Sequence, residues 1–204
     1  MSYASIVISI FSLCIAVASA WLTLFRRGRL AMTRPNVVFF GFDTAPKTTA
    51  KIFLRTLLYS TAVRGQVIEG MFAKLHHAGS DQIFSFWGYG ETNQLVPGSG
   101  LYVGQTGIAV NHHFVLSVHQ PAYEFAKGDY EIEVFVRLVG RKTPIRLSGF
   151  KLTLSAEHAG ILARHGGVLF ELNPDGRGYV GHARDKDDEL PPTDVVPFSR
   201  QSES

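Results

Sequence analysis

The sequence predicts an all-β protein, an antiparallel β-sandwich, preceded by one transmembrane helix. Three observations lead to this prediction. Ala4–Phe25 is an uncharged apolar run of 22 residues without proline. After residue 50, apolar and polar residues alternate with a period of two, as they do in strands that bury one face. Glycine- and proline-containing turns separate about ten such runs, which is typical of a β-sandwich.

The apolar run Ala4–Phe25 is long enough to cross a lipid bilayer. At about 1.5 Å per helical residue it measures roughly 33 Å, whereas the hydrocarbon core is about 30 Å thick. Tyr3 and Trp21 lie toward its two ends, where amphipathic rings favour the headgroup level. A core helix of a soluble protein would show a polar stripe, which this run lacks. We therefore expect the bilayer to be its direct partner.

A cleaved signal peptide is the main alternative, because Ala18–Ala20 has the small-x-small form of a cleavage site. Against it, Met1–Tyr3 carries no basic residue, and the run is longer than a usual signal-peptide core. Arg26, Arg27 and Arg29 follow the run, and positive flanks stay in the cytoplasm. The sequence thus predicts a single-pass protein of the plasma or inner membrane, with its N-terminus outside and its C-terminal domain cytoplasmic.

The formal charge of +3 is concentrated next to the apolar run. Residues 26–34 carry +4, residues 35–182 carry +2, and residues 183–204 carry −3. The basic pI of about 9.1 is therefore largely a juxtamembrane effect. Because the domain has no basic stripe in sequence, we expect it to bind neither nucleic acid nor lipid vesicles on its own. Cys14, inside the run, is the only cysteine, so the soluble part can form no disulfide.

Composition divides the chain into four parts. Residues 1–29 are the anchor with its basic flank, and residues 30–49, which contain Pro35 and Pro46, form a connector. Residues 50–182 form the sandwich domain. Residues 183–204 are polar, acidic and proline-containing, which predicts a disordered tail.

Within the domain, alternation and turn residues predict each element in order. Lys51–Ser60 and Gln66–His76 form a hairpin about Ala62–Gly65, and Ile83–Tyr89, Leu101–Val103 and Ile108–Val118 are strands. Tyr130–Leu138 alternates clearly, and Ile145–Leu154 follows it as a strand. Ser155 caps a short helix that ends at Gly166. A last hairpin joins Val168–Leu172 to Gly178–His182 through the turn Asn173–Gly176.

One strand carries a resemblance to a known family. Gly128–Val134 (GDYEIEV) resembles the penultimate core strand of immunoglobulin-like and fibronectin-type domains. The resemblance implies an immunoglobulin-like sandwich in which the Tyr130 hydroxyl bonds to nearby backbone as a tyrosine corner. It implies a fold class and no function.

Histidines are the first candidates for chemistry. His112, His113 and His119 lie on or next to one predicted strand, and a membrane-anchored hydrolase using them, with or without a metal, is the alternative function. Adjacent residues on a strand face opposite sides, so His112 and His113 cannot grip one metal. No His-x-His or His-x-x-x-His spacing occurs. We therefore predict no metal, no cofactor and no catalytic site.

Aromatic residues supply the candidate binding surface. Phe86, Trp87, Tyr89 and Tyr102 are close in sequence, and Trp and Tyr often anchor partners at interfaces. The sequence accordingly predicts a non-catalytic, membrane-tethered binding or scaffolding module with a protein partner at the membrane. Tethering raises the local concentration of such a module, so weak contacts suffice.

Overall fold

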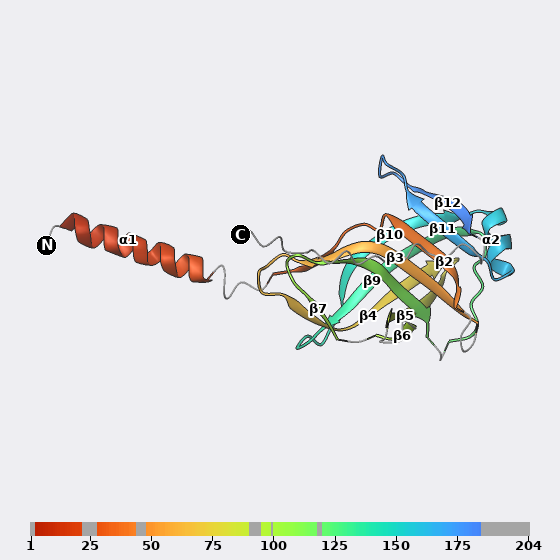
Figure 1. Cartoon of the computed structure of the whole chain (residues 1–204), viewed down its shortest axis with the longest axis horizontal. Helices are drawn as coiled ribbons and strands as arrows, with labels where there is room; N and C mark the ends of the chain where they lie inside the picture. The colour runs from red at the N-terminus through yellow and green to blue at the C-terminus, as the bar shows by residue number, and fades with distance from the viewer. Residues whose placement is uncertain are drawn as a thin grey trace, which may run out of the picture.

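The described part of the chain forms an N-terminal helix, a single large β-sheet and a second, short helix (Figure 1). The computed structural model describes residues 3–21, 28–43, 48–89, 95–98, 100–117 and 120–184. Helix α1 covers Tyr3–Ala20, and helix α2 covers Ala156–Ala163. The strands are β1 Leu30–Met32, β2 Val37–Asp43, β3 Thr49–Ser60, β4 Gln66–His77, β5 Ser80–Tyr89, β6 Leu95–Pro97, β7 Leu101–Val103, β8 Ile108–Leu116, β9 Gly128–Leu138, β10 Ile145–Leu154, β11 Gly167–Leu172 and β12 Tyr179–Arg184.

Helix α1 is long and apolar enough to span a membrane, and it buries none of its residues against the sheet. Its 18 residues are about 27 Å long at 1.5 Å per residue. The predicted apolar run ends later, at Phe25, and that part lies outside the described residues, as do Arg26 and Arg27. Length and composition are thus consistent with a single span.

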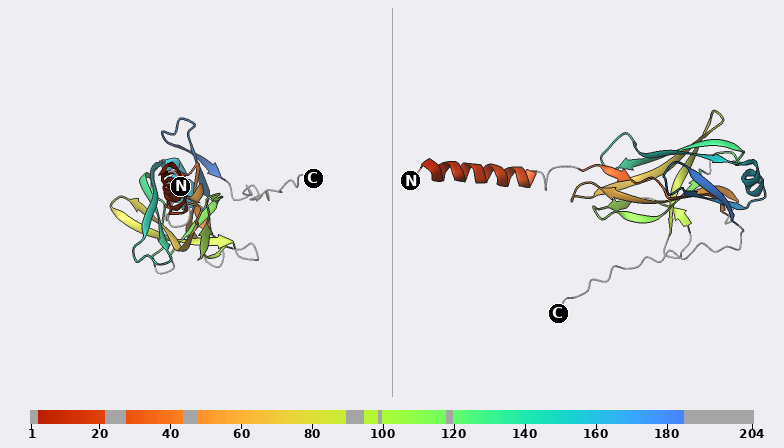
Figure 2. Two further views of the ribbon diagram at one scale, coloured as in Figure 1. Left: turned by 90° about the vertical axis from the view of Figure 1, so that its left-hand side faces the viewer. Right: turned by 90° about the horizontal axis from the view of Figure 1, so that it is seen from above.

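The strands form one continuous, mostly antiparallel sheet that curls toward closure (Figure 2). Its order is β10-β9-β4-β5-β8-β3-β2-β11-β12. An immunoglobulin-like sandwich has two separate sheets that face each other. Here the long strands β3 and β4 each pair with three other strands. This pairing joins all the strands into one barrel-like sheet. The all-β prediction is confirmed, and the two-sheet sandwich is not.

Two local predictions are wrong. The strands β3 and β4 are consecutive but do not pair, because β5 and β8 lie between them. No residue of the 61–65 connection has a positive φ, so it lacks the backbone of a tight hairpin turn. The predicted connector 30–49 contains β1 and β2, whose apolar residues pair with β3. The later elements are confirmed, including the Ser155 cap and the β11–β12 hairpin.

The core follows the alternation read from the sequence. Tyr130, Ile132, Val134 and Val136 of β9 are buried, and the residues between them are more exposed. The Tyr130 hydroxyl donates to the Ala126 carbonyl at 2.6 Å, which confirms the predicted bond from this hydroxyl to nearby backbone. The His77 ring stacks on Tyr130 with centroids 4.2 Å apart.

Side chains close the sheet where its two edge strands approach. The Phe150 ring on β10 lies 5.5 Å from the Tyr179 ring on β12. The Tyr179 hydroxyl donates to the Pro35 carbonyl at 2.7 Å, and Arg34 lies over the Tyr179 ring. Arg34 also donates to the Gly176 carbonyl. These contacts hold the β11–β12 hairpin against the bend between β1 and β2.

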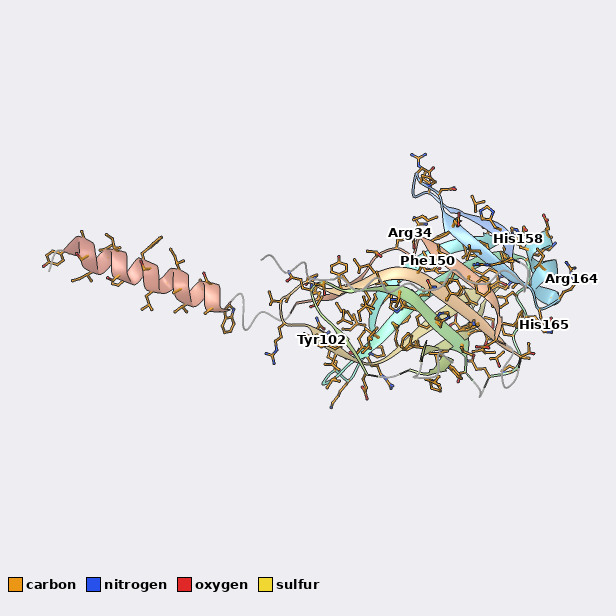
Figure 3. The ribbon with its side chains drawn as sticks, viewed as in Figure 1. Arg34, Tyr102, Phe150, His158, Arg164 and His165 are labelled. Carbon is orange, nitrogen blue, oxygen red and sulfur yellow. The ribbon has the colours of Figure 1, made fainter. Side chains whose placement is uncertain are left out.

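The barrel-like sheet has two distinct ends. The chain enters from α1 at one end, which we call the anchor end, where Thr61 N–H donates to the Arg29 carbonyl at 2.9 Å. Helix α2 lies at the opposite end, which we call the far end (Figure 1). Tyr102 lies toward the anchor end and His165 at the far end (Figure 3). Strand β3 runs between the two ends with 12 residues, a length of about 40 Å at 3.3 Å per residue.

Candidate functional site

A cavity of about 680 Å³ opens at the far end. This volume lies within the range of small-molecule pockets, roughly 300–1,000 Å³. Its walls come from the ends of β2, β3 and β8, the segment before β9, and helix α2 with the turn that follows it. The lining residues are Phe42, Thr48, Thr49, Ala50, Leu116, Ser117, Gln120, Ala122, Tyr123, Glu124, Phe125, Ala126, Ala159, Gly160, Leu162, Ala163 and His165.

The pocket combines apolar walls with hydrogen-bonding groups. Leu116, Phe125 and Leu162 are buried and belong to the main core, so the walls are continuous with the rigid interior. Thr49 and Ser117, which carry hydroxyls, line the same cavity. A mixture of this kind is suited to an amphipathic molecule, because apolar contact supplies affinity and a few polar groups fix its orientation.

Aromatic rings brace the wall beside β2. Phe125 packs edge-on against Phe42 at 5.8 Å and against Tyr123 at 5.2 Å between centroids. Phe125 also stacks on Phe40 of the core at 4.8 Å. Edge-to-face pairs stabilise by about 0.5–1.5 kcal/mol each beyond their buried area. The wall is therefore pre-formed, which lowers the entropy cost of binding.

Helix α2 places His165 at the pocket. The Ser155 hydroxyl accepts from His158 N–H at 3.1 Å and caps the start of the helix. At the other end, Gly166 N–H donates to Ile161 O and His165 N–H donates to Leu162 O, the pair of bonds of a Schellman motif. His165 occupies the left-handed position with φ +60°, where glycine is usual. Its ring meets Phe42 edge-on at 4.8 Å.

Two further groups give the pocket its polar character. Burial raises the pKa of the Tyr123 phenol, which hydrogen-bonds with the Tyr130 side chain, so this group is neutral at physiological pH. Gln120 accepts from Ile83 N–H at 3.3 Å through its side-chain oxygen, which ties the segment before β9 to β5. Glu124 and His165 line the same pocket, so a carboxyl and an imidazole accompany its hydrogen-bonding and apolar groups.

The histidines predicted for a hydrolase do not line this pocket. His112 and His113 are each only 1% exposed on β8. Their rings lie beside Phe86 and Phe53, at 6.3 and 5.3 Å between centroids. Burial lowers the pKa of each to about 4. Both are therefore neutral at physiological pH and cannot touch a substrate without an opening of the sheet; His119 lies outside the described residues.

The predicted aromatic surface is divided between different places. Phe86 packs on Phe114 inside the sheet, at 6.0 Å between centroids. Its neighbour Trp87 faces the other side of β5, and Tyr102 is 62% exposed on β7. The side chain of Tyr89 lies outside the description. Binding by these residues stays a prediction.

No group of three or more His, Cys, Asp or Glu residues suited to a metal occurs in the described part of the chain. The far-end pocket is the feature that sequence reasoning missed. Its lining residues lie between residues 42 and 165, so no short sequence motif predicts the pocket. The sequence does not indicate the positive φ of His165 either. The next residue is Gly166, and a glycine is the residue expected to take the left-handed conformation at the end of a helix.

Comparison with models of known protein families and with curated proteins gives no match for this chain.

Proposed function

We propose that this protein is a single-pass membrane protein that acts as a non-catalytic binding module. In this proposal α1 spans the plasma or inner membrane with the N-terminus outside, and the sheet domain lies in the cytoplasm. The domain binds a small amphipathic molecule in the far-end pocket. A protein partner at the membrane would then respond to the occupied or empty domain.

The observation that carries the proposal is the pocket itself. A cavity of about 680 Å³, lined by apolar and polar residues, lies at the end opposite the chain's entry from α1. A rigid strand framework supports it, and a pocket on such a framework binds with little reorganisation. His112 and His113 are each 1% exposed, which favours a structural role for this pair over hydrolysis.

The Tyr130 bond supports an immunoglobulin-like relationship, which we keep as a proposal beside the function. The continuous sheet would then be a modified form, in which β3 and β4 bridge the two sheets of the parent sandwich. The function proposed here does not depend on that relationship.

Filling the pocket tests the proposal. Ala163 is exposed and lines the pocket, so Ala163→Phe places a ring in the cavity without disturbing the core. Ala109→Phe, on an exposed position of β8 outside the pocket, is the matched control. We expect indole to give a saturation-transfer NMR signal with the full chain in nanodiscs and with Ala109→Phe, and to lose it with Ala163→Phe. Equal signals from both variants would contradict the proposal.

A further inference from the structure

Three connections that are far apart in the sequence meet at the anchor end. Backbone bonds join them: Ser60 N–H donates to Gly104 O at 3.0 Å, and Val139 N–H donates to Val67 O at 3.1 Å. The Gln66 side chain donates to the Gly28 carbonyl at 2.6 Å, which fixes the incoming chain to the same end. The connections are residues 61–65 between β3 and β4, 104–107 between β7 and β8, and 139–144 between β9 and β10.

This end displays apolar side chains to solvent. Val63 is 69% exposed, Val139 65% and Tyr102 62%. From residue 28 onward they are the three most exposed large hydrophobic side chains of the described part of the chain. They come from three different segments, so their gathering at one end is a property of the fold.

The same end is positively charged. Arg29, Arg64, Arg141 and Lys142 are exposed there, and the described residues 28–29, 61–65, 104–107 and 139–144 include no carboxylate.

The far end differs in this respect. Its described segments 120–127 and 155–166 carry two carboxylates, Glu124 and Glu157, and two cations, Lys127 and Arg164. Positive charge therefore marks the end that faces the anchor.

Cations interleaved with isolated apolar tips fit the surface of an anionic bilayer. Basic side chains near such a surface are attracted by its negative potential, while Val and Tyr side chains enter the headgroup region. The link between α1 and the domain keeps the anchor end close to the bilayer surface. Gly28 follows the last residue of α1, Ala20, by eight residues, so the two lie within about 29 Å of each other.

We propose that the anchor end of the domain docks on the anionic leaflet into which its own α1 is inserted. The domain then stands end-on, with the far-end pocket held away from the membrane and open to the aqueous phase. This inference rests on the membrane anchoring proposed above. It also replaces the expectation from sequence that the domain has no basic patch, because the patch is assembled from three separate connections.

Fluorescence quenching by headgroup-labelled lipids tests the docking in the full chain. With Cys14→Ser as background, Val63→Cys carries a fluorophore, and Glu157→Cys on α2 carries the same fluorophore as the matched control. One copy is placed in each nanodisc, which excludes contact between two copies. We expect quenching at position 63 to exceed that at position 157 several-fold when the lipid includes phosphatidylserine, and the excess to fall in phosphatidylcholine alone.

The variant Arg64→Glu with Arg141→Glu and Lys142→Glu tests the cause. Each cation contributes about fivefold to membrane association, so the triple variant should lose most of the excess quenching. Equal quenching at positions 63 and 157, or quenching unchanged in the triple variant, would overturn the docking while leaving the anchoring intact. Failure of the chain to incorporate into nanodiscs at all would overturn the anchoring and the docking together.

Discussion

The two buried histidines make the stability of the domain depend on pH. His112 and His113 are neutral in the folded state because burial lowers the pKa of each from 6.5 to about 4. For His113, the Lys51 ammonium and His112 act in the same direction as burial, and Asp43 opposes them. In the unfolded chain both imidazoles regain ordinary solvation and bind protons below pH 6.5.

This difference in proton binding decides whether stability rises or falls as the pH is lowered. The stabilising effect of keeping these rings neutral is fully present above pH 6.5 and is lost as the pH falls toward 4, because the unfolded state binds more protons. Relative to its value at pH 8, the free energy of unfolding at pH 5 is lower by about 2 kcal/mol for each histidine. Together they remove about 4 kcal/mol, a large share of the 5–15 kcal/mol typical of a domain.

Urea unfolding of the full chain in detergent micelles, followed by the β-sheet circular dichroism signal, measures this loss between pH 8 and pH 5. We expect His112→Leu with His113→Leu to remove most of the pH dependence, because leucine does not titrate. Wild type and double variant losing the same free energy over this range would refute the reasoning, since the dependence would then come from other groups.

Three further changes test single contacts. Tyr130→Phe removes the bond to Ala126 and should lower the free energy of unfolding by about 1 kcal/mol, measured by urea titration; no change would mean that water replaces the bond. Ser155→Ala removes the cap on His158 N–H and should cost about 1 kcal/mol in the same titration, and a neutral result would show that α2 needs no cap. His165→Gly relieves the left-handed backbone and should raise the melting temperature while weakening ligand binding; a lower melting temperature would show that its ring packs more than its backbone strains.

Local pattern was enough to find most strands. The alternation of Tyr130–Leu138 predicts both β9 and its buried face, because a period of two is set by the strand itself. The turn Asn173–Gly176 likewise predicts the β11–β12 hairpin. These features depend on neighbours in sequence, which a single chain displays directly.

Pairing between distant segments was beyond the sequence. Nothing local shows that β3 pairs with β8 and not with β4, since either partner buries the same face. The apolar run of β2 reads as part of a connector because its partners, β3 and β11, both come later in the chain. The prediction of a two-sheet sandwich was wrong for the same reason, since it also depended on which distant strands pair.

The pocket and the charged end share this origin. A net charge of +2 over residues 35–182 conceals the positive anchor end, since Arg64 and Arg141 are 77 residues apart in sequence and meet only in the fold. His165 and Phe42 are still farther apart, and their rings touch. Surfaces assembled from several connections require the topology before they can be seen.

Location of the far end relative to the membrane is the most direct test of a membrane-anchored, cytoplasmic binding module. The variant Glu157→Cys, in a chain with Cys14→Ser, is exposed to a membrane-impermeant maleimide in intact cells, and membranes are then washed at alkaline pH. We predict that the chain stays in the washed membranes and that position 157 is labelled only after lysis. Labelling in intact cells, or release of the chain by the wash, would contradict the proposed anchoring and orientation.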